Sequence, residues 1–449
     1  MMGRGFILDD FGHAFVASQE SVRFGLTHAS GGPYYAPVAY GSFKIDWILW
    51  GARPFPWAVS NLLLHIANTW LLYFLARGLW RSPTAGWWAG FGFALLFPAN
   101  VVAVMWIATR GHLIAAMFYL AAMIGALWFA RTDRFENRAA AAVVAFAVLS
   151  MFAKESGVTV LGAIAIVIFY ERRRQGRRVI STAFITLFTV LFAVLLIYLG
   201  LRANSEAISI NFSGGPISYA LSPGVFWENL LTYGWRTYGL LAFVAVAVAV
   251  SIHLRCLRPS LGSLTKDDVL LAVMLFAVAI APFILLRKQP GIYSYLPGIS
   301  AALLLGAIAS ALYQSTSGAQ SGFVPVTLTP IIFVVVAYVV LTVQDSRKWI
   351  QLAEINTAVL KQIAAQQPRV KPNTFIVLSY AEIDRRNRFP EGFGDWCFPW
   401  ALRVLYMDRT LDGEIIRKGE SYSTADKSSE IHFSFIGGDT ATVVKIGKS

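Results

Sequence analysis

Ten apolar segments, most of them about as long as a membrane span, follow one another between residues 57 and 344. A helix that crosses a bilayer needs about 20 mainly apolar residues. Charged residues make up 14% of the chain, against about 25% in an ordinary soluble domain. The sequence therefore predicts an all-α polytopic membrane protein of about 10 spans. The expected spans are 57–76, 85–104, 112–130, 139–153, 157–170, 180–200, 237–254, 268–286, 298–314 and 327–344.

Basic residues exceed acidic ones, and the formal net charge is +13. They stand in short clusters between apolar segments, where they orient helices towards the cytoplasm, so nucleic acid is not the expected partner. These clusters are Arg77 and Arg81; Arg131, Arg134 and Arg138; Arg172, Arg173, Arg174, Arg177 and Arg178; and Arg255, Arg258 and Lys266. The two cysteines, Cys256 and Cys397, are expected on opposite sides of the membrane, so no disulfide is predicted. We expect a multi-pass protein of the inner (plasma) membrane.

The two ends of the chain are predicted to lie outside the cytoplasm. Residues 1–56 form the first outer segment of an expected transmembrane domain over residues 1–346. No apolar helix precedes this segment, and exported segments of this length normally follow one, so we expect a further helix upstream of Met1.

After the last span, an amphipathic connecting helix is predicted over residues 347–368. Its apolar residues repeat at helical spacing; they are Trp349, Leu352, Ile355, Val359 and Ile363. Residues 369–449 are predicted to form a small extracytoplasmic α+β domain, with strand-like segments TFIVLSY, IHFSFIGG and TATVVKI.

Asp9 and Asp10, in FILDDFGH, are the strongest candidates for chemistry. Two adjacent carboxylates can divide the work of a reaction, because one takes a proton while the other holds a substrate. The alternative is a solvated turn or a helix cap, in which adjacent acids are also common.

Ionisable residues border the outer ends of several helices, where charges tend to mark function. Four basic residues could together hold a phosphate, although each alone could instead snorkel to lipid headgroups. They are Arg110, Lys154, Arg287 and Lys288. His112, Glu155, Tyr293 and Tyr295 are weaker candidates for a substrate site, and the two tyrosines also suit an interfacial belt. No metal motif surrounds His112 or His13.

Five stretches occur in a characteristic order: DDFGHAF; YYAPVAYGSFKIDWILWGARPFPWAVSNLLLHIANTWLLYFLAR; WIATRGHLIAAMFYLAAM; MFAKESGVTVLG; and IYSYLPGISAALLLG. Their order and spacing resemble the GT-C superfamily of membrane glycosyltransferases. Within it, the chain is similar to the protein O-mannosyltransferases and to the transmembrane, tetratricopeptide-repeat O-mannosyltransferases, although no such repeats follow here. Some positions differ from the residues that relatives commonly carry: Phe97, Asn100, Val102, His112 and Ile292.

This resemblance implies a GT-C-like helical bundle and an inverting, metal-independent enzyme without a cofactor. Such enzymes transfer a sugar from a polyprenyl-phosphate carrier to a hydroxyl of a protein or glycan outside the cytoplasm. Asp9 or Asp10 would be the general base, and Arg110 with Lys154 would hold the lipid phosphate.

The rival hypothesis is a non-enzymatic membrane protein. It would be a transporter of lipid-linked glycans, or a catalytically inactive relative that serves as a scaffold. A transporter would more often show inverted repeats and broken, polar helices at mid-membrane, and the sequence shows neither clearly.

Overall fold

The structure, a computed structural model, describes residues 5–29, 34–96, 98–132, 138–205, 207, 218–253, 264–287, 289–316, 324–381, 389–394, 397–420, 429–437 and 442–446. The chain forms two compact units. The first comprises residues 1–60, 105–108 and 344–449, and the second comprises residues 61–104 and 109–343. Both ends of the chain therefore contribute to the first unit.

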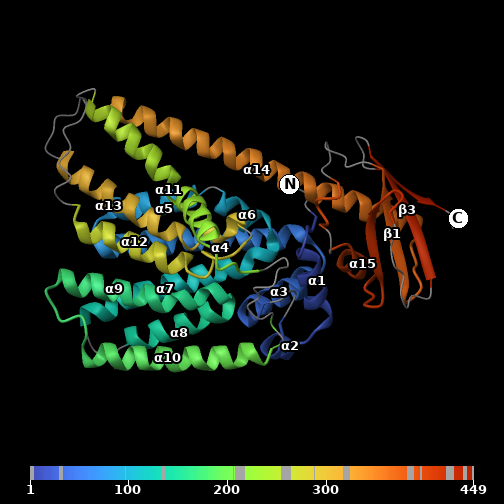
Figure 1. The fold of residues 1–449 in the computed structure, drawn as a ribbon, viewed down its shortest axis with the longest axis horizontal. Helices are drawn as coiled ribbons and strands as arrows, with labels where there is room; N and C mark the ends of the chain where they lie inside the picture. Colours follow the sequence, from blue (N-terminus) through green and yellow to red (C-terminus); the bar gives the residue numbers. More distant parts are fainter. Residues whose placement is uncertain are drawn as a thin grey trace. The chain divides into compact units, whose positions relative to one another are not determined.

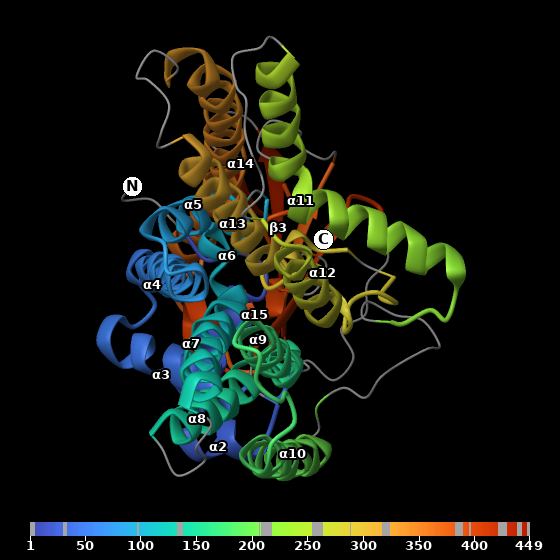
Figure 2. The same cartoon turned by 90° about the vertical axis from the view of Figure 1, so that its left-hand side faces the viewer.

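The second unit is a bundle of helices (Figures 1 and 2). Within it α7 packs against α8 and α9, α10 packs against α8, and α13 packs against α5 and α12. Its elements are α4 (Pro54–Trp80, from residue 61 on), α5 (Pro83–Ala94), α6 (Ala99–Met105, up to residue 104), α7 (Arg110–Thr132), α8 (Arg138–Ala153), η2 (Glu155–Thr159), α9 (Val160–Arg174), α10 (Thr182–Ala203), α11 (Pro223–His253), α12 (Lys266–Ile280), η3 (Gly291–Ser294), α13 (Gly298–Thr316) and the start of α14 (Val324–Gln366, up to residue 343).

Local signals set where several of these helices begin. Ser82 is the N-cap residue of α5, and its hydroxyl accepts a hydrogen bond from the N–H of Ala85. Pro83 follows at the first helical position, where the fixed φ of proline suits a helix. Thr265 and Asp268 form a capping box at the start of α12. Each of the ten expected spans overlaps one of the helices.

Three helical stretches in the described part of the chain are long and apolar enough to cross a membrane: α4, Ile107–Thr132 and α10. Together α5 and α6 are also long and apolar enough, but the two helices meet at an angle of 66°. They make a fourth span if this bent pair is counted as one. Pro98 lies at this break, and a proline disfavours helical geometry at the residue before it. The chain is therefore a multi-pass membrane protein, and the number of about ten spans stays a prediction.

The first unit joins helices from the start of the chain to a small sheet near its end. Its helices are α1 (Asp10–Gln19), α2 (Val22–Thr27), α3 (Pro37–Trp50), η1 (Ile107–Thr109, up to residue 108), the end of α14 and α15 (Phe398–Tyr406). Its strands are β1 (Thr374–Tyr380), β2 (Asp412–Arg417), β3 (Ser429–Gly437) and β4 (Thr442–Ile446).

The sheet has the order β2-β1-β3-β4. Strand β1 runs parallel to both neighbours, with Ile376 opposite Gly413 on β2 and Ile431 on β3, and β4 is antiparallel to β3. The predicted small C-terminal sheet is confirmed, since its three expected strands correspond to β1, β3 and β4. A separate domain over residues 369–449 stays a prediction. The sequence DGEIIR of β2 had not been recognised as a strand.

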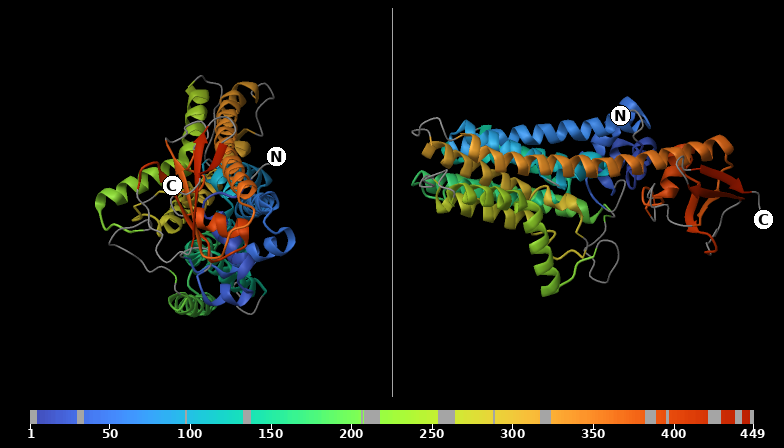
Figure 3. Two further views of the ribbon diagram at one scale, coloured as in Figure 1. Left: turned by 90° about the vertical axis from the view of Figure 1, so that its right-hand side faces the viewer. Right: turned by 90° about the horizontal axis from the view of Figure 1, so that it is seen from above.

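One face of the sheet packs on the end of α14 and on α15 (Figure 3). The apolar stripe expected on the connecting helix is buried here, with Ile355 at 5% exposure and Val359 and Ile363 at 0%. The same core contains Phe6, Phe11 and Phe43 from the N-terminal segment. Helix α14 runs unbroken from Val324 to Gln366, so the predicted boundaries at residues 346 and 368 lie within it or just beyond it.

Arginines at one end of the second unit are bonded to buried acceptors. Arg131 Nε lies 2.8 Å from Glu171 Oε1, and Glu171 is 3% exposed. The Arg131 Nη2 also donates to the carbonyl of Gly78 at 2.7 Å, and Gln175 Nε2 donates to Glu171 at 2.7 Å. Arg131, which belongs to one of the clusters expected to orient the chain, therefore also joins α4, α7 and α9.

Glu171→Gln is expected to lower the stability of the protein by about 1–3 kcal/mol, because Arg131 loses its carboxylate in a largely buried position. The measurement is thermal unfolding in detergent micelles. Asp267→Asn is the matched control, since its partner Arg173 lies 3.3 Å away in an exposed pair, and such pairs contribute at most about 1 kcal/mol. Equal losses in the two variants would contradict the prediction.

Candidate functional site

The Asp9-Asp10 pair forms the turn into α1, in the first unit. Asp10 is 1% exposed, and both of its carboxylate oxygens accept backbone N–H groups. Oδ2 accepts from Ile7 at 3.2 Å, and Oδ1 accepts from Ala108 at 2.7 Å. The Asp10 carboxylate therefore ties the N-terminal segment to residues 105–108.

Asp9 is half-buried and occupies the N-cap position of α1, but its side chain makes no capping hydrogen bond. The Cys397 thiol instead donates to Asp9 Oδ1, with 3.5 Å between sulfur and oxygen. Burial first, and then the Asp9 and Asp10 carboxylates, raise the pKa of Cys397 far above its usual range. The thiol therefore stays protonated and can act only as a donor to Asp9. The two acids thus have different surroundings, and Asp9 is the more accessible.

Aromatic side chains line the inner side of this turn. His13 stacks on Phe43, with ring centroids 4.4 Å apart, and Trp57 packs edge-on against Phe6 at 5.5 Å. Lys44 Nζ donates to the carbonyls of Ala17 and Glu20 at the end of α1, at 2.7 and 2.8 Å. These contacts hold α1 against α3. In the described part of the chain, no group of three or more His, Cys, Asp or Glu side chains is arranged to hold a metal ion.

Arg110, the first residue of α7, is 1% exposed in the second unit. Its Nε donates to Asn61 Oδ1 at 2.8 Å, and Asn61 Nδ2 donates to the carbonyl of Ala103 at 2.9 Å. The Arg110 side chain is therefore held in position by an amide from α4. This side chain is buried and hydrogen-bonded within the protein, and it does not extend towards lipid headgroups.

His112 lies one residue further along, 5% exposed, and its ring contacts Tyr293 with centroids 5.7 Å apart. Tyr293 is half-buried and stacks on Phe283 at 4.2 Å. Lys154, between α8 and η2, is partly buried in the same unit. The structure therefore brings two predicted residues into contact, His112 and Tyr293, and His112 lies two positions after Arg110 on α7.

The other charged candidates differ from one another. Glu155 is paired with Arg202 of α10, at 3.3 Å between Oε1 and Nε. Arg287 is exposed, and Lys288 lies outside the described residues. Arg236 of α11 had not been recognised; its guanidinium donates to the Gln289 carbonyl at 2.6 Å and lies 5.9 Å from the ring centre of Tyr233. The available signal was the position of Arg236 just before the apolar segment that begins at residue 239 of α11.

Tyr295 is fully buried and takes no part in a surface belt. Its hydroxyl lies 2.7 Å from His65 Nδ1 and accepts from Asn68 Nδ2 at 3.2 Å. This network joins the segment before α13 to α4. Tyr295 thus has a structural role, whereas the neighbouring Tyr293 keeps a partly exposed ring.

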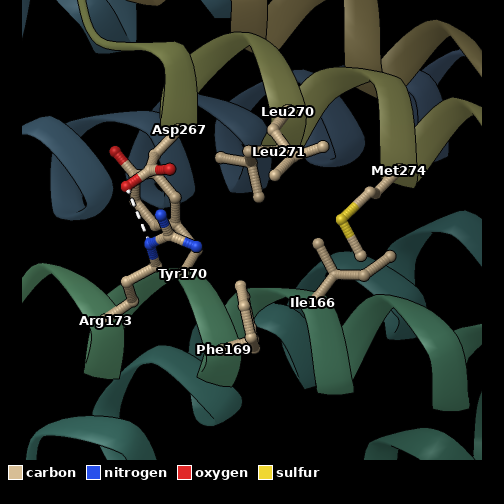
Figure 4. A pocket seen from close by; sticks show the side chains of 8 residues that line it. All are labelled: Ile166, Phe169, Tyr170, Arg173, Asp267, Leu270, Leu271 and Met274. Carbon is tan, nitrogen blue, oxygen red and sulfur yellow. Dashed lines mark ion pairs between the residues drawn. The ribbon is translucent and has the colours of Figure 1, made fainter. Parts of the chain in front are cut away.

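A small cavity lies between α9 and α12, and Figure 4 shows its lining. Its volume is about 10 Å³, which holds one water at most. Arg173 and Asp267 form an ion pair at its edge, and Met274 and Leu271 make it apolar. It contains none of the predicted site residues.

No protein-family model matches the sequence. Over 163 residues, 35% of the chain, it is 29% identical to the protein O-mannosyl-transferase tmtc2 of Xenopus laevis. It is 28% identical over the same length to the protein O-mannosyl-transferases TMTC2 of Mus musculus and Homo sapiens. The match spans 19% of the length of each of these relatives. The resemblance to transmembrane O-mannosyltransferases is therefore confirmed, as a similarity over part of the chain.

Among solved structures, the fold overlaps with the crystal structure of ArnT from Cupriavidus metallidurans in the apo state. The TM-score is 0.41 at 14% sequence identity, and the overlap covers 81% of this chain and 69% of that chain.

Proposed function

We propose, from its similarity to protein O-mannosyl-transferases, that this chain is a membrane glycosyltransferase. It would transfer a sugar from a polyprenyl-phosphate-sugar donor to an acceptor hydroxyl on the extracytoplasmic side. The observation that carries the proposal is the difference between the two acids. Asp10 is buried against backbone N–H groups, while Asp9 is partly exposed and does not cap its helix.

In the proposed reaction, the acceptor oxygen attacks the anomeric carbon as Asp9 takes the hydroxyl proton. The bond between the anomeric carbon and the phosphate oxygen breaks on the opposite face, and the polyprenyl phosphate leaves with the electron pair. The new bond therefore forms with inversion. A general base of this kind contributes about 100- to 10,000-fold to the rate.

The leaving phosphate needs charge neutralisation more than protonation, and fixed cations supply this most effectively in a site that excludes water. Arg110 and Lys154 are proposed for this role, with Arg287 and Lys288 as further phosphate contacts. The buried setting of Arg110 supports its part, because a guanidinium already held by Asn61 loses little entropy when it binds phosphate. His112, Glu155 and Tyr293 are proposed to border the substrate.

Transfer from a polyprenyl-phosphate sugar tests the proposal. The full gene product would be purified into lipid nanodiscs and supplied with polyprenyl-phosphate mannose, then with other polyprenyl-phosphate sugars, together with membrane and secreted acceptor proteins. We expect sugar on the acceptor and release of polyprenyl phosphate, with no transfer from a nucleotide sugar. Binding of these donors without any transfer would favour the transporter or scaffold hypothesis.

We further propose that the loop after α9 is cytoplasmic and the C-terminal sheet extracytoplasmic. Arg178 in the first of these segments and Lys418 in the second are exposed. In a Cys256→Ser background, an impermeant thiol reagent applied to intact cells should label Lys418→Cys and spare Arg178→Cys, while both react after lysis. The reverse pattern would contradict the proposed orientation.

A further inference from the structure

We propose that Cys397 and Asn356, from the C-terminal part of the chain, are positioning residues for the Asp9-Asp10 turn. In this view the C-terminal sheet domain is a structural component of the acid site. The inference rests on the proposed function in naming Asp9 as the base, but the contacts on which it depends can be tested without that function.

The backbone before Asp9 is strained and is held by the C-terminal residues. Leu8 has φ 47°, which is uncommon for a residue with a side chain and tends to mark functional sites. Its N–H donates to the carbonyl of Gly392 at 3.0 Å. A conformation of this kind persists only where neighbouring contacts enforce it.

Asn356 joins the two segments that meet here. Its Nδ2 donates to the carbonyl of Phe6 at 3.1 Å and to that of Gly392 at 2.8 Å, and the residue is 1% exposed. Any side chain at position 392 would place its Cβ 2.4 Å from Asn356 Oδ1. The close approach of Gly392 is therefore needed for the bonds that hold residues 6–8.

Packing continues this attachment along α1. Phe11 stacks on Phe393 with ring centroids 5.9 Å apart, and Phe15 contacts Trp400 of α15 at 5.6 Å. Phe11 and Phe393 are both buried in the core that also contains the sheet residues Ile376 and Leu378. Helix α1 therefore cannot move far without disturbing the C-terminal domain.

Cys397 completes the arrangement at the carboxylate itself. It is the N-cap residue of α15, yet its side chain makes no capping bond, and it donates to Asp9 Oδ1 instead. The residue is 0% exposed. A buried donor of fixed position restricts the rotation of the Asp9 carboxylate.

Kinetics of Cys397 variants test the role. Cys397→Ala should lower kcat about 10-fold with little change in KM, because the carboxylate loses its orientation and not its substrate contacts. Cys397→Ser, which restores a donor, should return kcat to within about 3-fold of the wild type. Equal activity of Cys397→Ala and the wild type would overturn the proposal, as would a Cys397→Ser variant as slow as Cys397→Ala, which would indicate packing alone.

A double-mutant cycle on thermal unfolding tests the contact without any assay of activity. Cys397→Ala and Asp9→Ala each remove one partner of the hydrogen bond, so the loss of stability in the double variant should be smaller than the sum of the two single losses. Glu20→Ala, at the opposite end of α1, is the matched control, and its loss should add to that of Cys397→Ala. Additive losses for Cys397→Ala and Asp9→Ala would overturn the contact.

The two sets of results separate the two proposals. Non-additive losses of stability in a protein that transfers no sugar would leave the contact standing and refute the proposed function. Loss of transfer in Asp9→Asn, with full activity in Cys397→Ala, would leave the function standing and refute the positioning role.

Discussion

Asp9→Asn is expected to reduce sugar transfer by about 100- to 10,000-fold while leaving thermal unfolding of the protein unchanged. The amide has nearly the same shape as the carboxylate but cannot take the acceptor's proton. Asparagine keeps the Oδ1 that accepts from Cys397, and Asp9 does not cap α1, so the substitution should leave the fold intact. Turnover in nanodiscs and melting in detergent would be measured on the same preparation.

Asp10→Asn is the matched comparison, and it should fail in a different way. Asparagine at this buried position would turn an NH2 group towards Ile7 or Ala108, whose N–H groups both donate to Asp10. The expected cost is about 1–3 kcal/mol of stability. If Asp9→Asn keeps wild-type turnover, this turn is not the site of the base, and the transporter or scaffold hypothesis replaces the enzymatic one.

Arg110→Ala is expected to raise KM for the polyprenyl-phosphate donor by about 10- to 100-fold, with a smaller change in kcat. A hydrogen bond to a charged group contributes about 1.5–3 kcal/mol, and a phosphate contact formed before the reaction affects binding in the ground state as well. Arg110→Lys should restore only part of the affinity, because lysine lacks the guanidinium fork.

Asn61→Ala distinguishes two roles of Arg110, which are binding of the sugar donor's phosphate and stabilisation of the fold. It removes the amide that holds Arg110 Nε and the bond to Ala103 but keeps the positive charge. We expect this variant to lose stability with a smaller rise in KM than Arg110→Ala. Identical KM values in the two variants would show that Arg110 acts only by joining α4 to α7, and the phosphate contact would have to be sought at Lys154 or Arg236.

The segments predicted as membrane helices are helical in the structure because long apolar composition is a local property. The same holds for β1 and β3, whose alternating and aromatic residues are typical of strands. Strand β2, with the sequence DGEIIR, is short and polar at its start. It becomes a strand because the neighbouring β1 offers a parallel partner, from Phe375 opposite Asp412 to Tyr380 opposite Arg417. A partner of this kind cannot be recognised from six residues.

In the candidate site, too, local sequence predicted some features, while others depend on residues far away along the chain. Asp9, Asp10, Arg110 and Lys154 stand out in the sequence because charged groups beside apolar helices are costly unless they have a use. The different surroundings of the two acids could not be predicted from the sequence. Asp10 accepts a hydrogen bond from the N–H group of Ala108, which is 98 positions away along the chain. Arg236 was missed for a similar reason, because it donates a hydrogen bond to the carbonyl of Gln289, which is 53 positions further along the chain.

The sequence by itself determined that this chain is a helical membrane protein with a small sheet domain and an acidic pair near its start. Segment length, apolar content and strand pattern are each set within about 20 residues. Only the tertiary structure decided which acid is accessible and what holds it. Asp9 and Cys397 are 388 positions apart, and their hydrogen bond exists because the first helix and the last domain share one hydrophobic core. Burial of apolar surface brings such segments together without regard to their separation along the chain.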